Sequence, residues 1–243
     1  MTQKQGLRWS DAFLPIVIVA AAITYGRYVL NHPMDSMVAN FLTLPLILRC
    51  LYQHLYLILI SSSLAIATSV PLGILLTRPK LKFLCTYVVG IVNICQTIPS
   101  FAVIALSVSF LGIGAKTAIF ALWIYSLLPI LNNTIAGIIG VDPAIIDSAR
   151  GMGLTKGRIL LKVELPLAMP VIMAGIRTAV VINVATAVIA AYVGGGGLGD
   201  IIIAGKNINR WQVLVCGAGY ATLIALLFDH LLGIVERTLS HSQ

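Results

Sequence analysis

Charged side chains are scarce in this sequence, since Asp, Glu, Lys and Arg make up only 10% of its 243 residues, against roughly 25% in a typical soluble domain. Hydrophobic residues make up 59%, and the mean hydropathy is +0.99. No hydrophilic stretch is long enough to form a separate soluble domain of ordinary size. These shortages exclude a soluble enzyme and an appended catalytic domain, and they indicate a chain whose solvent is lipid.

Patterns for metal, cofactor and catalytic chemistry are also missing. The four cysteines have no C-x-x-C spacing, so we interpret them as small core residues rather than as metal or redox groups. The four histidines are scattered, and neither H-E-x-x-H nor G-x-S-x-G occurs. Residues 112–117 hint at a phosphate-binding loop, but Ala115 stands where that loop requires glycine. The sequence therefore predicts that this chain is not an enzyme and binds no metal, cofactor or ATP.

Long apolar runs predict an all-α, polytopic membrane bundle. Six runs reach the roughly 20 residues that a helix needs to cross a bilayer, and they cover residues 12–30, 54–77, 83–111, 117–140, 167–193 and 212–235. The first resembles a secretion signal, but Tyr25 and Arg27 interrupt it and no small-x-small exit follows, so we expect a retained helix. The third contains Pro99 and is long enough to be tilted or broken.

Basic residues are sorted to one side of the predicted bundle. One side collects Lys4, Arg8, Arg78, Lys80, Lys82, Arg150, Lys156, Arg158, Lys162 and Arg237, and the other has only Arg27, Arg49, Lys116, Lys206 and Arg210. The positive-inside rule then places both termini and the segment 141–166 in the cytoplasm. The net charge of +8 is explained by this sorting, so we expect no nucleic-acid partner. The expected units are an N-terminal helix with an outer loop (1–53), a core domain (54–236) and a C-terminal tail (237–243).

The cytoplasmic segment begins with a helix signal. Asp142 and Pro143 are a good N-cap and first-turn pair, so a short helix is predicted over about 144–150. Its small residues and tight turn suit a projection that a partner can approach closely. The pattern alone is equally typical of an amphipathic helix on the membrane surface.

The second half of the segment predicts a turn and a return into the membrane. Gly151 and Gly153 end the first helix, and Thr155 is placed to cap a second short helix with a basic face. Pro166 then marks re-entry into the fifth span.

This segment resembles the EAA motif of ATP-binding-cassette importer permeases: Glu-Ala-Ala, three free positions, Gly, nine free positions, Ile, one free position, Leu-Pro. The matching positions here are Asp147, Ser148, Ala149, Gly153, Val163, Leu165 and Pro166. Asp replaces Glu, Ser replaces Ala and Val replaces Ile. The resemblance implies the type I importer permease fold and a coupling helix that docks in a groove of a separate ATPase. It assigns this coupling to Asp147, Ser148, Ala149, Arg150, Gly151 and Gly153, with Leu165 and Pro166 fixing the exit into the membrane.

Three further stretches resemble osmoprotectant permeases, which import glycine betaine, choline, carnitine or proline betaine: residues 96–106, 164–179 and 194–205. The resemblance implies a bacterial inner-membrane subunit, surrounded by lipid, that pairs with a second permease copy or a paralogue. It also implies an ATP-binding-cassette ATPase dimer, which holds ATP and Mg, and an extracytoplasmic solute-binding protein. Methionine or another small polar solute stays open as the cargo. A carrier driven by an ion gradient is the rival class, although no midplane ion site or inverted repeat is evident, and a scaffold without transport is a third reading.

Polar residues inside the predicted spans are candidates for the translocation pathway. They are Asn93, Gln96, Thr97, Pro99, Ser100, Phe101, Tyr125, Asn132, Asn133, Arg177 and Asn183. Each of the uncharged ones is as readily explained by a hydrogen bond to a neighbouring helix. Phe101, Trp123 and Tyr125 offer aromatic faces to a methylammonium solute. Arg177 is either a gating residue or half of a structural pair, with Asp229 as one possible partner.

A run of glycines follows the fifth predicted span. Gly194, Gly195, Gly196, Gly197 and Gly199 formally satisfy the G-x-G-x-x-G pattern of a dinucleotide site, but a membrane helix precedes them where that site needs a strand. We therefore expect a flexible or re-entrant loop at the outer surface, which is a candidate outer gate.

Overall fold

The structure is a computed structural model that describes residues 9–240 of the chain. Every regular element in this range is helical. The helices are α1 (Trp9–Asn31), α2 (Ser36–Phe41), α3 (Leu44–Leu76), α4 (Lys82–Thr97), α5 (Ser100–Leu111), α6 (Ala115–Ile139), α7 (Pro143–Gly151), α8 (Lys156–Ile159), α9 (Leu165–Thr186), α10 (Leu198–Asn207) and α11 (Trp211–Ser240). A π-helical turn (Leu160–Glu164) joins α8 to α9, and a 3-10 helix (Ala187–Val193) follows α9.

The six expected spans are present. Five of the described helical segments are long and apolar enough to cross a membrane, and α4 and α5 give a sixth if they are counted as one broken span. The break is a bend of 100° between them. It falls at Ile98 and Pro99, because the residue before a proline is driven out of the helical region and Ile98 has ψ of 130°. The expectation that the third span is tilted or broken is thus confirmed.

Two helices extend beyond the predicted limits. α3 begins at Leu44, ten residues before the expected start, and α11 continues to Ser240. The divisions expected at 53/54 and 236/237 therefore fall inside continuous helices. Arg49 and Gln53 interrupt the apolar run at the start of α3, yet the neighbouring Ile47 and Cys50 are buried and hold this part against the bundle. The short helices α2 and α10 were not expected.

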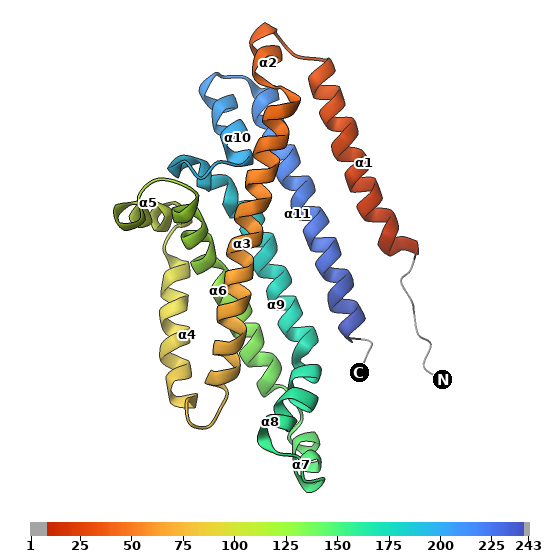
Figure 1. Cartoon of the computed structure of the whole chain (residues 1–243), viewed down its shortest axis with the longest axis vertical. Coiled ribbons are helices and arrows are strands. Elements are labelled where there is room, and N and C mark those ends of the chain that lie inside the picture. Colours follow the sequence, from red (N-terminus) through yellow and green to blue (C-terminus); the bar gives the residue numbers. More distant parts are fainter. Residues whose placement is uncertain (1–8, 241–243) are drawn as a thin grey trace.

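The core of the bundle is a row of helices in which α3 packs against α6, α6 against α9 and α9 against α11 (Figure 1). Small residues permit close approach: a Cβ on Gly73 would meet Thr134 at 2.7 Å, and one on Gly175 would meet Asn133 at 2.5 Å. Such contacts hold helices together in lipid, where burial of apolar area offers little driving force between them. α1 packs mainly on α11, and its outward side chains, such as Phe13 and Ile16, are apolar.

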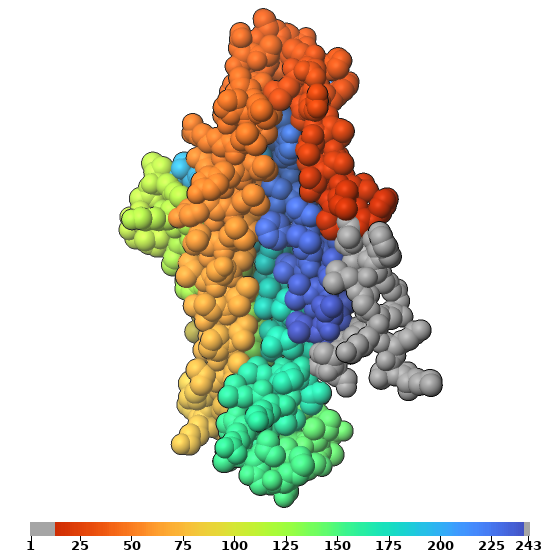
Figure 2. Space-filling view, turned by 45° about the vertical axis from the view of Figure 1, so that its right-hand side comes forward, coloured from red at the N-terminus to blue at the C-terminus, as the bar shows by residue number. Residues whose placement is uncertain are grey.

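The two ends of the bundle differ. At one end α7 and α8 form a projection, the α7–α8 hairpin, which is green in the space-filling view and extends beyond the other helices (Figure 2). The α3–α4 loop, with Arg78 and Lys80, lies at the same end, and Lys82 follows as the first residue of α4 (Figure 1). Lys4 and Arg8 lie outside the described residues. The basic residues of the hairpin and of this loop are thus gathered at one end, as the sequence predicts.

At the opposite end, Asp35 ties three helices together. Its Oδ1 accepts the N–H of Val38 at 2.8 Å and so caps α2, while its Oδ2 accepts from Arg210 Nε at 2.5 Å between α10 and α11. The hydrogen bond from Val38, followed by the Arg210 guanidinium, holds the pKa of Asp35 below its ordinary value. The carboxylate form that makes both contacts is therefore present at neutral pH and is lost only on strong acidification.

We predict that Gly175→Ala destabilises the bundle, because the new methyl group would lie 2.5 Å from Asn133 Cβ and 2.8 Å from the Pro129 carbonyl of α6. Overpacking of this kind costs about 1–3 kcal/mol. The measurement is the unfolding midpoint of the purified protein in detergent. Gly90→Ala in α4 is the matched control, since nothing lies within 4 Å of the added methyl group. Equal midpoints for the two variants would contradict the predicted packing.

Candidate functional site

The start of the hairpin follows the sequence prediction. Asp142 accepts the N–H of Ala144 on Oδ1 at 2.8 Å, and Pro143 occupies the first helical position, where its missing N–H costs nothing. The resulting helix α7 has nine residues. Its Ala149 is only 2% exposed, and α7 packs against α8 and the π-helical turn. A small side chain at this position therefore lets the helix lie close to its support.

The end of α7 explains the glycine in the motif. The N–H of Gly153 bonds to the Arg150 carbonyl at 2.9 Å, and the N–H of Leu154 bonds to the Ala149 carbonyl at 3.2 Å. These two bonds form a Schellman motif, which requires a left-handed residue just beyond the helix. Gly153 occupies that position with φ of +78°. The helix itself runs through Gly151, so Gly153 is the residue that turns the chain.

The outward face of α7 is open. Asp147 and Arg150 form an ion pair of 2.8 Å, with 69% and 63% of their side chains exposed, respectively. A pair this exposed contributes little to stability. Ser148 and Met152 are exposed beside them. The hairpin thus presents charged, polar and apolar groups together at its tip.

The second half of the hairpin differs from the prediction in two ways. Thr155 makes no capping hydrogen bond, and α8 is only the first turn of a helical segment that continues to Val193. A π-helical turn interrupts this segment just before Pro166, where the N–H of Leu165 bonds five residues back to the Leu160 carbonyl. Pro166 has no N–H and its ring crowds the preceding turn, so the helix widens there instead of restarting.

Glu164 lies in this wide turn and was missed by the sequence analysis. It is 8% exposed and accepts a hydrogen bond from Nη2 of Arg78, in the α3–α4 loop, at 2.5 Å. The sequence signal that could have indicated a partnered acid is a single carboxylate within an apolar stretch, beside Leu165 and Pro166. The pair connects the base of the hairpin to the end of α3.

Most of the polar pathway candidates bond within the bundle. Gln96 donates from Nε2 to the Tyr125 carbonyl at 2.8 Å, and the Tyr125 hydroxyl donates to the Ile98 carbonyl, so both fix the bend between α4 and α5. Asn183 is fully buried and donates from Nδ2 to Ser61 at 2.7 Å and to Ser62 at 2.9 Å, which joins α9 to α3.

Other candidates lie at or near the surface of the described chain. Asn133 donates to the Pro129 carbonyl and Thr97 to the Ile94 carbonyl, each at 2.8 Å within its own helix. The exposed candidates are Asn93, Thr97, Pro99, Phe101 and Asn132, and Ser100 is half-buried. The structure therefore gathers the exposed candidates of the third span around the α4–α5 bend.

The aromatic candidates are not grouped together. Phe101 makes an edge-to-face contact with Tyr192, with ring centroids 5.4 Å apart. Trp123 instead donates its indole N–H to Thr68 at 3.1 Å and lies beside Phe120. Tyr192 was not singled out from the sequence.

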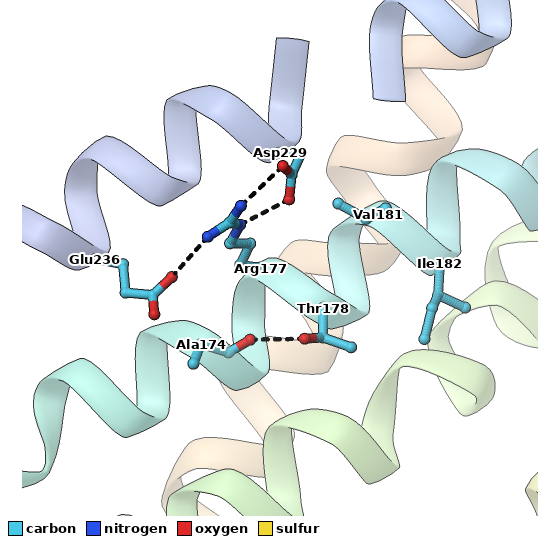
Figure 3. A pocket seen from close by; sticks show the side chains of 7 residues that line it. All are labelled: Ala174, Arg177, Thr178, Val181, Ile182, Asp229 and Glu236. Carbon is cyan, nitrogen blue, oxygen red and sulfur yellow. Dashed lines mark hydrogen bonds and ion pairs between the residues drawn. The ribbon is translucent and has the colours of Figure 1, made fainter. Parts of the chain in front are cut away.

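Arg177 has partners, and the expected Asp229 is one of them (Figure 3). Its Nε and Nη2 donate to the two Asp229 oxygens at 2.7 and 2.8 Å, and its Nη1 donates to Glu236 at 3.2 Å. Gly233 lies between the two acids on α11, and a Cβ there would come within 3.1 Å of the guanidinium. The group borders an open hollow of about 360 Å³ between α9 and α11. The geometry is that of an ion-paired clamp between two helices.

The glycine run is packed more deeply than expected. Only Gly194 is exposed, while Gly195, Gly196 and Gly197 are buried, which favours the re-entrant loop over the flexible one of the two expected forms. Gly194, Gly196 and Gly197 have φ of +69°, +76° and +96°. The N–H of Gly197 bonds to Gln53 Oε1 at 3.2 Å. The loop folds back against α3, which is the re-entrant alternative.

Gly199 has a different role from the rest of the run. It lies in the first turn of α10, where a Cβ would come within 2.0 Å of the Val188 carbonyl. Its lack of a side chain lets α10 pack against the 3-10 helix.

With this geometry established, comparison with known proteins identifies the family. The sequence profile of the family described as "Binding-protein-dependent transport system inner membrane component" matches residues 69–241. The chain belongs to this family. It is therefore a multi-pass transport component of the membrane.

Several relatives of this family member are similar over most of their length. The carnitine transport permease protein OpuCB of Listeria monocytogenes is 46% identical over 78% of this chain and 86% of its own. The choline transport system permease protein OpuBB of Bacillus subtilis is 45% identical over 78% and 86%. The osmoprotectant import permease protein OsmY of Salmonella typhimurium is 43% identical over 77% and 80%. The resemblance to importer permeases, and to osmoprotectant permeases among them, is confirmed.

Solved structures support the fold of this family member. A chain of the inward-facing MetNI methionine ABC transporter has a TM-score of 0.73 and 24% identity, over 82% of this chain and 99% of its own. A chain from an amino acid ABC transporter has a TM-score of 0.69 and 21% identity, over 85% and 100%. The type I importer permease fold is confirmed.

We predict that Arg177→Met destabilises the protein, because it removes the donors that hold Asp229 and Glu236. Because 36% of the Arg177 side chain and 42% of the Asp229 side chain are exposed, we expect the loss in unfolding free energy to be about 1 kcal/mol or less. The double variant Arg177→Met/Asp229→Leu is expected to recover part of the loss, since it no longer leaves that acid without its partner. Unfolding midpoints in detergent measure both effects. A folded Arg177→Met protein that has lost uptake would assign Arg177 to the pathway instead.

Proposed function

We propose that this chain is the membrane-spanning subunit of an ATP-driven importer for osmoprotectants that carry a quaternary ammonium group, such as glycine betaine, choline or carnitine. The names of the relatives that are 43–46% identical support this solute class. The likeness to the methionine transporter, at 24% identity, extends to the fold alone.

The observation that carries the coupling proposal is the α7–α8 hairpin. It projects from the end of the bundle where basic residues gather, and it presents Asp147, Arg150 and Met152 on a rigid turn set by Gly153. Such a projection fits a groove in an ATPase of the ATP-binding-cassette class on the cytoplasmic side. Closure of an ATPase dimer would then displace two hairpins, one from each permease copy or paralogue. ATP and Mg belong to the partner, and this chain holds no cofactor.

The position of the hairpin explains how the displacement enters the membrane. α8, the π-helical turn and α9 are one helical segment, so movement of the hairpin is applied directly to α9. α9 in turn contacts α3, α6 and α11. Alternation between an inward-facing and an outward-facing state is the movement that this arrangement supports.

The remaining roles complete the importer. An extracytoplasmic binding protein delivers the solute at the end that holds α2 and α10, and both termini face the bacterial cytoplasm. The exposed candidates around the α4–α5 bend, Asn93, Thr97 and Phe101, line half of the pathway, and a second permease completes it. The glycine loop 194–197 is the outer gate, and its left-handed Gly196 and Gly197 lie against Gln53 and His54 of α3.

We predict that Gly153→Val and Asp147→Lys each uncouple ATP hydrolysis from uptake while the protein stays in the membrane. Valine is strained at φ of +78°, and lysine reverses the charge at the exposed tip. Gly153→Asn is the matched control for backbone strain, because asparagine adopts the left-handed conformation readily. The measurement is the amount of solute taken up per ATP hydrolysed in proteoliposomes that contain the complete complex. Unchanged uptake in both Gly153→Val and Asp147→Lys would exclude the hairpin as the coupling element.

We predict ATP-dependent uptake of labelled glycine betaine, choline or carnitine by the complete complex, and no uptake by this chain alone. Uptake of labelled methionine and of labelled proline is measured in parallel, as a comparison with solutes of different chemistry. Uptake driven by an ion gradient through this chain alone would favour a secondary carrier and overturn the proposal.

A further inference from the structure

The α7–α8 hairpin is attached to the bundle at few points. Its two helices pack on each other and on the π-helical turn. A hollow of about 230 Å³ lies between the start of α7, the end of α6 and the start of α9. The hollow is lined by Gly137, Gly140, Val141, Ile145, Leu167 and Val171, among others. Because this hollow separates α7 from α6, the packing contacts that support α7 lie mainly with α8 and the π-helical turn.

The π-helical turn places one charged side chain against another helix. The bond from Leu165 N–H to the Leu160 carbonyl widens the helix, and Glu164 at the end of that turn has a side chain that is only 10% exposed. Its Oε2 lies 2.5 Å from Nη2 of Arg78. A hydrogen bond between two charged groups is stronger than one between neutral groups.

Arg78 is held ready for this contact. Its Nε donates to the Ile74 carbonyl at 3.2 Å, and its Nη2 donates to the Thr77 hydroxyl at 3.0 Å. Arg78 follows directly on the carboxyl end of α3, where a cation is favoured by the helix dipole. The guanidinium is therefore fixed to the end of α3 before it meets Glu164.

We propose that Arg78 and Glu164 are positioning residues that make the α3–α4 end of the permease follow the hairpin during each ATP cycle. This inference rests on the proposed coupling function. Without the pair, a displaced hairpin moves α9 and leaves the α3–α4 loop behind. With it, the loop and the start of α4 move as well, and α4 leads to the bend at Pro99 that carries the exposed pathway candidates. Gln96 and Tyr125 then fix that bend to α6.

The test uses the complete complex, with its ATPase and binding protein, in proteoliposomes. Glu164→Gln keeps the size of the side chain and removes its charge. We expect it to lower the solute taken up per ATP hydrolysed by about ten-fold while ATP hydrolysis continues. Lys80→Gln is the matched control, since it removes an exposed cation from the same loop and is expected to leave this ratio unchanged.

Reversing the charges of Arg78 and Glu164 distinguishes a role in positioning the α3–α4 loop from a role in protein stability alone. Arg78→Glu and Glu164→Arg are each expected to lower the ratio, and the double variant is expected to restore it to within about two-fold of the wild-type value. If the double variant does not fold, Arg78→Gln provides the second measurement and is expected to match Glu164→Gln. A wild-type ratio in Glu164→Gln, with only a lower unfolding midpoint, would overturn the proposal and make the pair purely structural.

The wild-type complex distinguishes this inference from the proposed function. If the wild type shows ATP-dependent uptake and Glu164→Gln takes up as much solute per ATP hydrolysed as the wild type, the positioning role alone is overturned. If the wild-type complex shows no ATP-dependent uptake, the proposed function is overturned, and the positioning role with it.

Discussion

In lipid, a polar group has no water to bond with and has to find its partner within the protein. This constraint determines where the helices of this chain bend and how they are joined. The carbonyl of Ile98, at the break between α4 and α5, accepts a hydrogen bond from the Tyr125 hydroxyl. The amide nitrogen of Asn183 donates to two serines of α3, and the Arg177 guanidinium donates to two acids of α11. Polar residues that look like a pathway in the sequence therefore often hold the bundle together.

The hairpin is stabilised differently, by local hydrogen bonds, because it lies beyond the apolar part of the bundle. There its backbone ends are satisfied by Asp142 at the start of α7 and by the Schellman bonds around Gly153 at its end. These local bonds give a short helix a fixed shape without a core of its own. The side chains at the tip stay exposed, as docking to another protein requires. The single helical segment from Lys156 to Val193 links this polar projection to the centre of the bundle.

The sequence was sufficient for the spans, the α7 cap and the turn that ends α7, since each depends on local chemistry: apolar length, an Asp-Pro pair and a glycine that adopts positive φ. It was not sufficient where the outcome depends on distant partners. The start of α3 was placed too late because Arg49 and Gln53 interrupt the apolar run, although Ile47 and Cys50 on the same stretch are buried. The choice between a flexible and a re-entrant glycine loop depends on contact with Gln53, which is far away in sequence. The Arg78–Glu164 contact joins residues 86 positions apart, and no local pattern predicts it.

The first helix stands apart from this architecture. It packs mainly on α11, and the family profile begins at residue 69, within α3. A helix with one main neighbour can be added to or removed from the edge of a bundle without disturbing the helices behind it. The family profile thus covers the last two turns of α3 and every helix from α4 to α11, and it leaves α1 outside.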